Sequence, residues 1–138
     1  MDKTHTSALV IIPPKECWPQ IQAIREKYDR KVDRWMPHVN LMYPFLVRED
    51  YDKIKQKLKN WCQKLESFEV HLHTFRYFKH RYEYFTLWLR PRPKKRIIRL
   101  QHELLKVVPE CNDVNRFKGV CKPHLSVGQG DGSAEISQ

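Results

Sequence analysis

A weak internal repeat is the sequence feature that most constrains the fold of this chain. The first copy runs from the apolar segment 8–12 through Pro13-Pro14 and a helical segment to Pro37-His38-Val39-Asn40. The second copy runs from 85–89 through Pro91 and another helical segment to Pro123-His124-Leu125-Ser126. Each copy reads as a strand, a proline break, a helix and a strand that opens on Pro-His. The repeat predicts two pseudo-symmetric lobes, each contributing one histidine at the start of a strand.

Hydrophobic periodicity predicts helices and strands in both copies. Apolar residues recur at helical spacing in a segment with Pro19 in its first turn, in 51–65 and in 94–108. Buried or alternating strand patterns occupy 7–12, 39–47, 68–79, 84–90 and 125–127. The strands 68–79 and 84–90 are joined by a basic turn, which predicts a hairpin. The whole pattern favours a mixed α+β domain.

The length of 138 residues fits one domain, and a hydrophobic content of 41% is enough for a core. No apolar run approaches the roughly 18 residues of a membrane span, so we expect no membrane partner. We expect one domain over 1–128 and a flexible or truncated Gly/Ser-rich tail over 129–138. The four cysteines, which form no Cys-x-x-Cys pair, favour free thiols in an intracellular, reducing compartment.

The charge balance indicates a polyanionic or phosphorylated partner. Lysine and arginine number 26 against 16 acidic residues, so the formal net charge is +10. Such a surplus favours RNA, oligonucleotides or nucleotides, with an acidic membrane surface second. A basic run around the third helix start either grips a phosphate backbone or is a solvated helix start; its members are Arg90, Arg92, Lys94, Lys95, Arg96 and Arg99.

The two Pro-His strands carry the candidate catalytic residues. Side chains two apart on a strand share a face, so His38 lies with Asn40 and His124 lies with Ser126. One neutral imidazole can take a proton from water while a protonated one gives a proton to a leaving oxygen. Asn40 and Ser126 can donate hydrogen bonds to phosphate oxygens. A single histidine at a strand start is more often a packing or hydrogen-bonding residue, but the duplicated setting favours function. This pairing suits phosphodiester cleavage and requires no metal or other cofactor.

Three further residues are candidates for substrate binding. Tyr43 follows the first Pro-His strand and Phe117 precedes the second, and either ring could stack on a nucleobase. For both rings, a core position is an equally good interpretation. Lys122 is next to the second motif and could screen the charge of a bound phosphate. His71 and His73 have metal-ligand spacing but no third ligand, so the outer face of a sheet explains them better.

The two motifs resemble those of the two-histidine phosphoesterase superfamily, which includes 2′-5′ RNA ligase-like proteins and RNA cyclic phosphodiesterases. The matching segments are Pro37-His38-Val39-Asn40-Leu41-Met42-Tyr43-Pro44-Phe45 and Lys122-Pro123-His124-Leu125-Ser126-Val127-Gly128-Gln129. Within this superfamily the chain resembles the eukaryotic branch, which includes the central domain of an A-kinase anchoring protein. The resemblance implies a bilobal α+β fold with antiparallel sheets lining a central cleft, helices outside, and a metal-independent site.

The family pattern is His-x-Thr or His-x-Ser twice, and this chain departs from it at Asn40. The resemblance predicts a hydrolase for RNA-type phosphates, acting on 2′,3′-cyclic phosphate ends or 2′-5′ linkages. Asn40 and the short C-terminal part motivate an alternative, a non-catalytic RNA-end or nucleotide binding module. Since relatives continue beyond the second motif, we also expect a sheet edge open to another chain.

Overall fold

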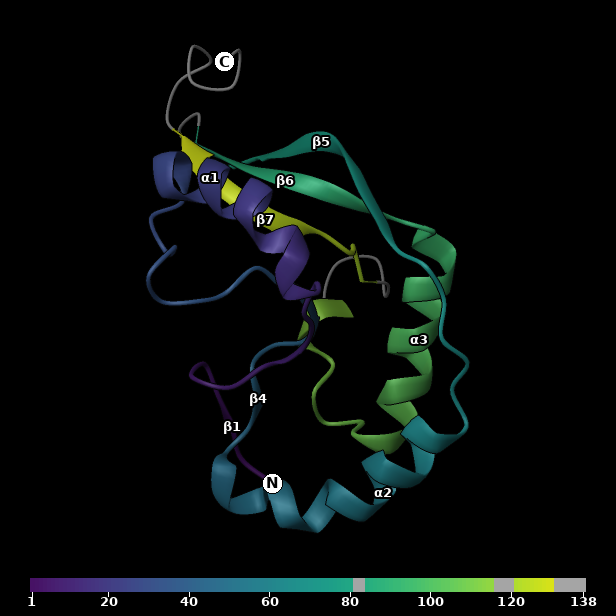
Figure 1. Cartoon of the computed structure of the whole chain (residues 1–138). Helices are drawn as coiled ribbons and strands as arrows, with labels where there is room; N and C mark the ends of the chain where they lie inside the picture. Colours follow the sequence, from purple (N-terminus) through teal and green to yellow (C-terminus); the bar gives the residue numbers. More distant parts are fainter. Residues whose placement is uncertain (81–83, 116–120, 131–138) are drawn as a thin grey trace. The chain divides into compact units, whose positions relative to one another are not determined.

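The computed structural model of the chain describes residues 1–80, 84–115 and 121–130 (Figure 1). Its α-helices are α1 (Trp18–Tyr28), α2 (Tyr51–Gln63) and α3 (Lys94–Val107). The strands form one sheet of order β5-β6-β7 and two small pairs, β1-β4 and β2-β3. Helices and antiparallel strands together confirm the predicted α+β fold class.

The chain divides into two compact units, each assembled from both halves of the sequence. The first unit comprises residues 1–10, 40–70 and 92–123, and the second comprises 11–39, 71–91 and the residues from 124 onward. His38 and His124 both belong to the second unit. The prediction of one histidine in each lobe was therefore wrong, because the chain crosses between the units several times and does not complete one before starting the other.

The first unit is built from short strands and two helices. β1 (Lys3–Thr4) pairs antiparallel with β4 (Phe45–Leu46). The buried residues of this unit include Ile54 of α2 and Ile97 and Leu104 of α3. The predicted apolar stripe of α3 is therefore buried largely as expected. The predicted stripe of α2 is too long, since α2 ends at Gln63 and Leu65 beyond it is 40% exposed.

The predicted strand 39–47 is two strands in the structure. β3 (Val39–Met42), which pairs with β2 (Leu9–Ile11), ends where the cis peptide bond Tyr43-Pro44 precedes β4. Proline cannot donate to a strand ladder, so the interruption falls where the sequence places Pro44. The two-residue strand β1 was not predicted, because so short a segment has no periodicity.

The second unit contains the longest strands of the described chain. β5 (His71–Lys79) lies beside β6 (Phe85–Arg92), which confirms the hairpin, and β7 (Leu125–Gly130) is the other neighbour of β6. β6 continues through Pro91, where the sequence predicted a break. β7 continues to Gly130, so residues 129 and 130 of the predicted tail lie in a strand. Residues 131–138 lie outside the described part, and the division into a domain and a tail stays a prediction.

The register between β6 and β7 contains a bulge beside the second histidine motif. Leu89 faces Leu125 and Trp88 faces Ser126, whereas Leu87 faces Gly128, so Val127 is the extra residue of β7. A bulge bends a strand and re-aims the side chains next to it. β7 has β6 as its one strand neighbour among the described residues, and pairing of its outer edge with another chain stays a prediction.

One apolar cluster forms the core of the second unit. Its buried members come from α1, β3, β6 and β7: Ile21, Val39, Leu89, Leu125 and Val127. α1 lies along β7 (Figure 1), and the approach is close at Gly128, where an added Cβ would stand 2.6 Å from the Cβ of Tyr28. Glycine at this position lets the helix contact the strand directly.

All four cysteines are free thiols, as the sequence predicted. Cys17 and Cys62 are exposed, whereas Cys111 and Cys121 are buried. Burial raises the pKa of the Cys121 thiol to about 11, so this thiol stays protonated at neutral pH. None of the described helices combines the length and apolar character that crossing a bilayer would need.

The close contact at Gly128 predicts a specific cost for a single methyl group. Gly128→Ala should lower the free energy of unfolding by about 1–3 kcal/mol, because the helix must move away from β7. Urea unfolding of the full chain measures this loss. Tyr28→Gly removes the clashing carbon, so the double variant should lose less than the sum of the single variants. An unchanged unfolding midpoint for Gly128→Ala would contradict the packing described here.

Candidate functional site

The first candidate residue, His38, lies immediately before β3 and is half-buried. Its Nδ1 is 2.7 Å from the carbonyl oxygen of Met36, and its ring lies 6.0 Å from the ring of Trp35. A carbonyl can only accept, so Nδ1 carries a proton in this contact. A neutral His38 must then hold its lone pair on Nε2, for which the described residues provide no hydrogen-bond partner.

The second candidate residue, His124, lies immediately before β7 in an aromatic setting. The ring of Phe78 meets it edge-on at 5.0 Å, and the ring of Trp88 lies at 5.9 Å. Phe78 and Trp88 in turn stack on each other with ring centroids 4.7 Å apart. Since Trp88 faces Ser126 in the strand register, the indole shares its sheet face with Ser126 and the imidazole. The two aromatic rings restrict the orientation of His124.

The predicted alternation of polar and apolar side chains is present in both Pro-His strands. Val39, Leu125 and Val127 are buried, whereas His38, His124 and Ser126 are half-buried. Val39 and Leu125 belong to the same apolar cluster of the second unit. The residues that directly follow the two histidines therefore share one core, although they are far apart in sequence.

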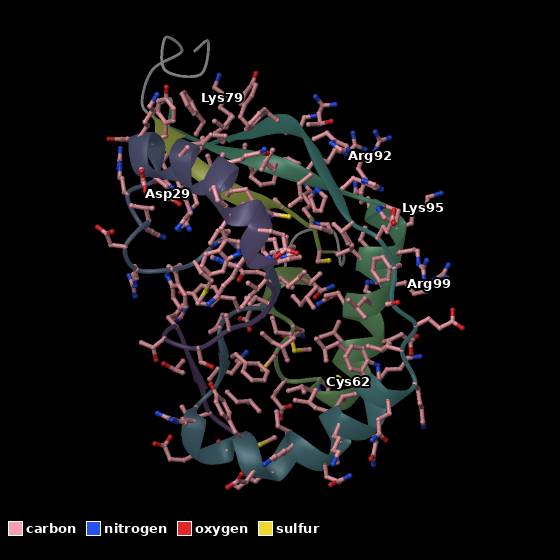
Figure 2. All side chains as sticks on the ribbon, in the orientation of Figure 1. Asp29, Cys62, Lys79, Arg92, Lys95 and Arg99 are labelled. Atoms are coloured by element: carbon pink, nitrogen blue, oxygen red, sulfur yellow. The ribbon has the colours of Figure 1, made fainter. Side chains whose placement is uncertain are left out.

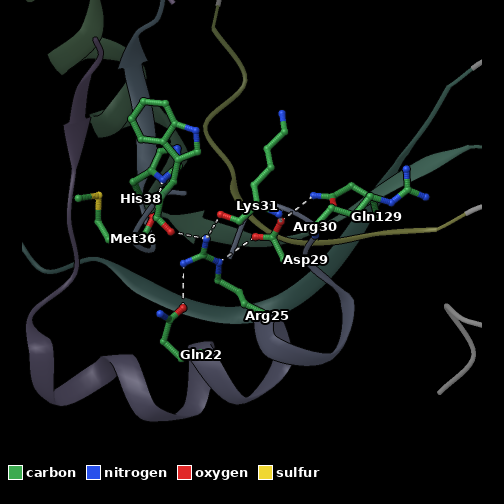
Figure 3. A network of polar contacts seen from close by, with 9 residues as sticks. Gln22, Arg25, Asp29, Arg30, Lys31, Met36, His38 and Gln129 are labelled. Carbon is green, nitrogen blue, oxygen red and sulfur yellow. Dashed lines mark hydrogen bonds and ion pairs between the residues drawn. The ribbon is translucent and has the colours of Figure 1, made fainter. Parts of the chain in front are cut away.

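A buried polar network holds the loop that leads to His38 (Figure 3). The side chains of Arg25 and Asp29 are 2% and 4% exposed, and Arg25 Nε donates to Asp29 Oδ2 at 2.8 Å. Arg25 Nη2 donates to the carbonyl of Trp35 at 2.6 Å, and Nη1 donates to Gln22. Since Met36 follows Trp35 and accepts from His38, the guanidinium is one residue removed from the histidine's own acceptor.

The same network reaches the second motif through Gln129 of β7. Gln129 Nε2 donates to Asp29 Oδ1 at 3.1 Å, and its Oε1 accepts from the backbone nitrogen of Arg30 at 2.9 Å. Burial by itself would raise the pKa of Asp29. Hydrogen bonds from Arg25, Lys31 and Gln129, together with the Arg25 charge, outweigh burial and hold the pKa of this carboxyl below its usual range. Asp29 is therefore a carboxylate at neutral pH.

The remaining predicted site residues are distributed differently. Asn40, two residues from His38, belongs to the first unit, and its buried Oδ1 has no hydrogen-bond partner among the described residues. Tyr43 also belongs to the first unit, where its hydroxyl donates to the carbonyl of His5. Lys122 is exposed in the first unit, and Phe117 lies outside the described residues. Their roles in binding stay predictions.

Most residues of the predicted basic run are exposed at the end of β6 and on α3, whereas Arg90 is half-buried. In Figure 2 the labelled side chains of Arg92, Lys95 and Arg99 project outward from these elements. Arg96 differs, because its guanidinium carbon lies 4.4 Å from the ring centroid of Phe68. The first turn of α3 holds no acidic residue, so its cations add to the positive end of the helix dipole.

Sequence reasoning missed the residues that support the two histidines. Arg25 lies on an otherwise apolar helix face, at i+4 from Ile21, and this position was the available signal for a buried cation. Phe78 and Trp88 lie on strands already predicted, but their contact with His124 depends on the register of three strands. Neither the bulge at Val127 nor that register is encoded in a local pattern.

Comparison with known proteins identifies the protein family. Residues 13–138 match the sequence model of the 2′-5′ RNA ligase superfamily, so the chain belongs to this family. Proteins named "Putative phosphoesterase" from Staphylococcus epidermidis and Staphylococcus aureus are 30% and 28% identical to it over 64 residues. The aligned region covers 46% of this chain and 38% of the length of each of these relatives.

Removal of the Asp29 charge should destabilise the protein in a pH-dependent way. Asp29→Asn leaves the buried Arg25 cation unpaired, which costs about 3–5 kcal/mol of unfolding free energy at neutral pH. Because the folded pKa of Asp29 is lowered, its stabilisation is present above the unfolded pKa of about 4 and is lost as the pH falls below it. Chemical unfolding at pH 7 and near pH 3 measures both values.

Asp33→Asn is the matched control for this variant, because Asp33 is exposed on the same loop. It should change the unfolding free energy by no more than about 0.5 kcal/mol. An Asp29→Asn deficit that is small at pH 7, or that grows on acidification, would contradict the ion-pair account.

Proposed function

We propose that this protein is a metal-independent phosphodiesterase acting on RNA-type phosphates, with His38 and His124 as the acid–base pair. The observation that carries the proposal is the shared core of Val39 and Leu125, which anchors both histidine-bearing strands in the second unit. Membership of the 2′-5′ RNA ligase superfamily supports the same chemistry. The names of the staphylococcal relatives point to phosphoesters as the substrate class.

On a 2′,3′-cyclic phosphate end the reaction is a hydrolysis with two proton transfers. One neutral imidazole takes a proton from water as the water oxygen bonds to phosphorus. The bond from phosphorus to the 3′ oxygen breaks, and the other imidazole, initially protonated, gives its proton to that oxygen. The product is a 2′-phosphate. Ser126, on the face of His124, donates a hydrogen bond to a non-bridging oxygen as its charge grows.

The geometry of His38 suits either role in this cycle. With Nδ1 donating to the Met36 carbonyl, Nε2 is the nitrogen that takes or gives the catalytic proton. The carbonyl favours a proton on Nδ1 in both charge states, so the ring keeps its orientation as Nε2 is protonated and deprotonated.

An RNA-type substrate is supported by charge. The net charge of +10 attracts polyanions, and the exposed Arg92, Lys95 and Arg99 offer three cations for a phosphate backbone. Assignment to the eukaryotic branch of the superfamily remains a prediction, since the staphylococcal relatives reported above are bacterial.

Turnover of an oligonucleotide with a 2′,3′-cyclic phosphate end, in EDTA, tests the proposal. We expect 2′-phosphate product, and a loss of about 10²- to 10⁴-fold in kcat for His38→Ala and for His124→Ala. His102→Ala is the matched control, because His102 is an exposed histidine of the first unit. Loss of activity on chelation, or wild-type rates in both site variants, would refute the mechanism.

A binding module is the second candidate function, and Asn40 favours it. The amide stands where the family pattern has a hydroxyl, and its Oδ1 is buried without a hydrogen-bond partner in the described chain. In this alternative the wild-type protein binds RNA ends in a salt-sensitive manner without turnover.

Asn40→Thr separates the two functions. If the wild-type protein is a catalyst, Thr should change kcat by less than about tenfold, since either side chain can donate one hydrogen bond to phosphate. A gain of 10²-fold or more, from a wild-type rate near background, would instead favour the binding module. Single-turnover kinetics with the cyclic-phosphate oligonucleotide gives both rates, and the affinity for the 2′-phosphate product serves as the control for site integrity.

A further inference from the structure

We propose that Arg25 is a positioning residue that holds His38 in its active orientation, and that Gln129 connects the Arg25–Asp29 pair to β7. The inference rests on the proposed function of His38. It also makes a claim about the imidazole that can be tested without any substrate. The one-step connection runs from the guanidinium to the Trp35 carbonyl, and from the adjacent Met36 carbonyl to His38 Nδ1.

The guanidinium is suited to this task by its shape. It donates to Asp29, Gln22 and the Trp35 carbonyl at 2.6–2.8 Å, with a longer contact of 3.4 Å to the Lys31 carbonyl. These acceptors lie in different directions from one planar group. A lysine ammonium is a single point donor and cannot reproduce this fork. The loop that follows α1 is therefore held by one rigid side chain at its start and near its end.

Burial of this cation carries a desolvation penalty, which indicates that Arg25 has a role beyond packing. Arg25 lies on a helix face directed at the core, where an apolar side chain of similar volume would pack without desolvating a charge. Instead Arg25 donates four hydrogen bonds, and two of them go to the loop carbonyls of Lys31 and Trp35 (Figure 3). Such a network specifies one loop conformation, which a catalytic histidine at the loop end requires.

Gln129 gives the network a second anchor. Its amide bridges Asp29 and the backbone of Arg30, and it lies on the strand that begins with Leu125 beside His124. A shift of the loop relative to β7 would therefore break the contacts of Gln129 to Asp29 and to the backbone of Arg30. The hydrogen-bond network of Arg25, Asp29 and Gln129 links the two histidine-bearing segments, in addition to their common apolar core.

The test compares Arg25→Lys with Arg30→Lys in the 138-residue chain. Arg30 is exposed on the same loop, and its contact to Gln129 uses only its backbone nitrogen. Nitrogen-15 NMR of the histidine rings reports which nitrogen of neutral His38 carries the proton. We expect the Nδ1–H form in the wild type and in Arg30→Lys, and a mixture of both tautomers in Arg25→Lys.

Kinetics on the cyclic-phosphate oligonucleotide gives the second readout. Arg25→Lys should lower kcat by about 10- to 100-fold with KM within about twofold, because misplacement of the His38 imidazole affects the transition state more than binding. Gln129→Ala, which leaves the ion pair intact, should move both readouts in the same direction by a smaller amount. If Arg25→Lys does not fold, the His38 tautomer and the kcat of Gln129→Ala test the positioning role instead.

The outcomes separate this inference from the proposed function. A changed His38 tautomer in a protein without turnover would support the positioning role and refute the enzyme. Unchanged tautomer and kcat in the folded variants, with an active wild type, would overturn the positioning role alone.

Discussion

The apolar cluster of the second unit is the constraint on which the candidate site depends. It joins Val39 and Leu125, which are 86 residues apart in sequence and directly follow His38 and His124. Because strand side chains alternate, burial of these two residues turns their polar neighbours away from the core. Contact between α1 and Gly128 completes the packing on the covered side of β7. The two histidines are far apart along the chain. The proposed chemistry therefore depends on the burial of Val39 and Leu125 in one core.

Polar contacts add orientation to what the apolar core brings together. His38 is fixed by a carbonyl that the Arg25 network holds, and His124 is fixed by the rings of Phe78 and Trp88. The surroundings of the two imidazoles differ, since a backbone carbonyl contacts His38 and two aromatic rings contact His124. The two rings have different environments, which is what an acid and a base require.

The sequence predicts the features of the structure that depend on short stretches of chain. Periodicity identified the three α-helices and the β5-β6 hairpin, and the Pro-His motifs identified the strands that carry the candidate site. The division of the chain into units was not predictable, because it depends on which distant segments pack together. The bulge at Val127, the buried charge of Arg25 and the extension of β7 to Gly130 are tertiary features for the same reason. The position of Arg25 on the helix face of Ile21 could indicate burial, but it does not show which carboxylate or carbonyls the guanidinium binds.

The central claim is that the two imidazoles act on one phosphorus atom, and a titration with a nucleoside 2′-monophosphate tests it most directly. The chain is labelled with nitrogen-15 in its histidines, and the ring signals of His38 and His124 are followed as the ligand is added. The account predicts that both rings shift together with one dissociation constant, while the signals of His102 stay unchanged. A shift of only one of the two rings, or separate dissociation constants for each, would contradict a shared site.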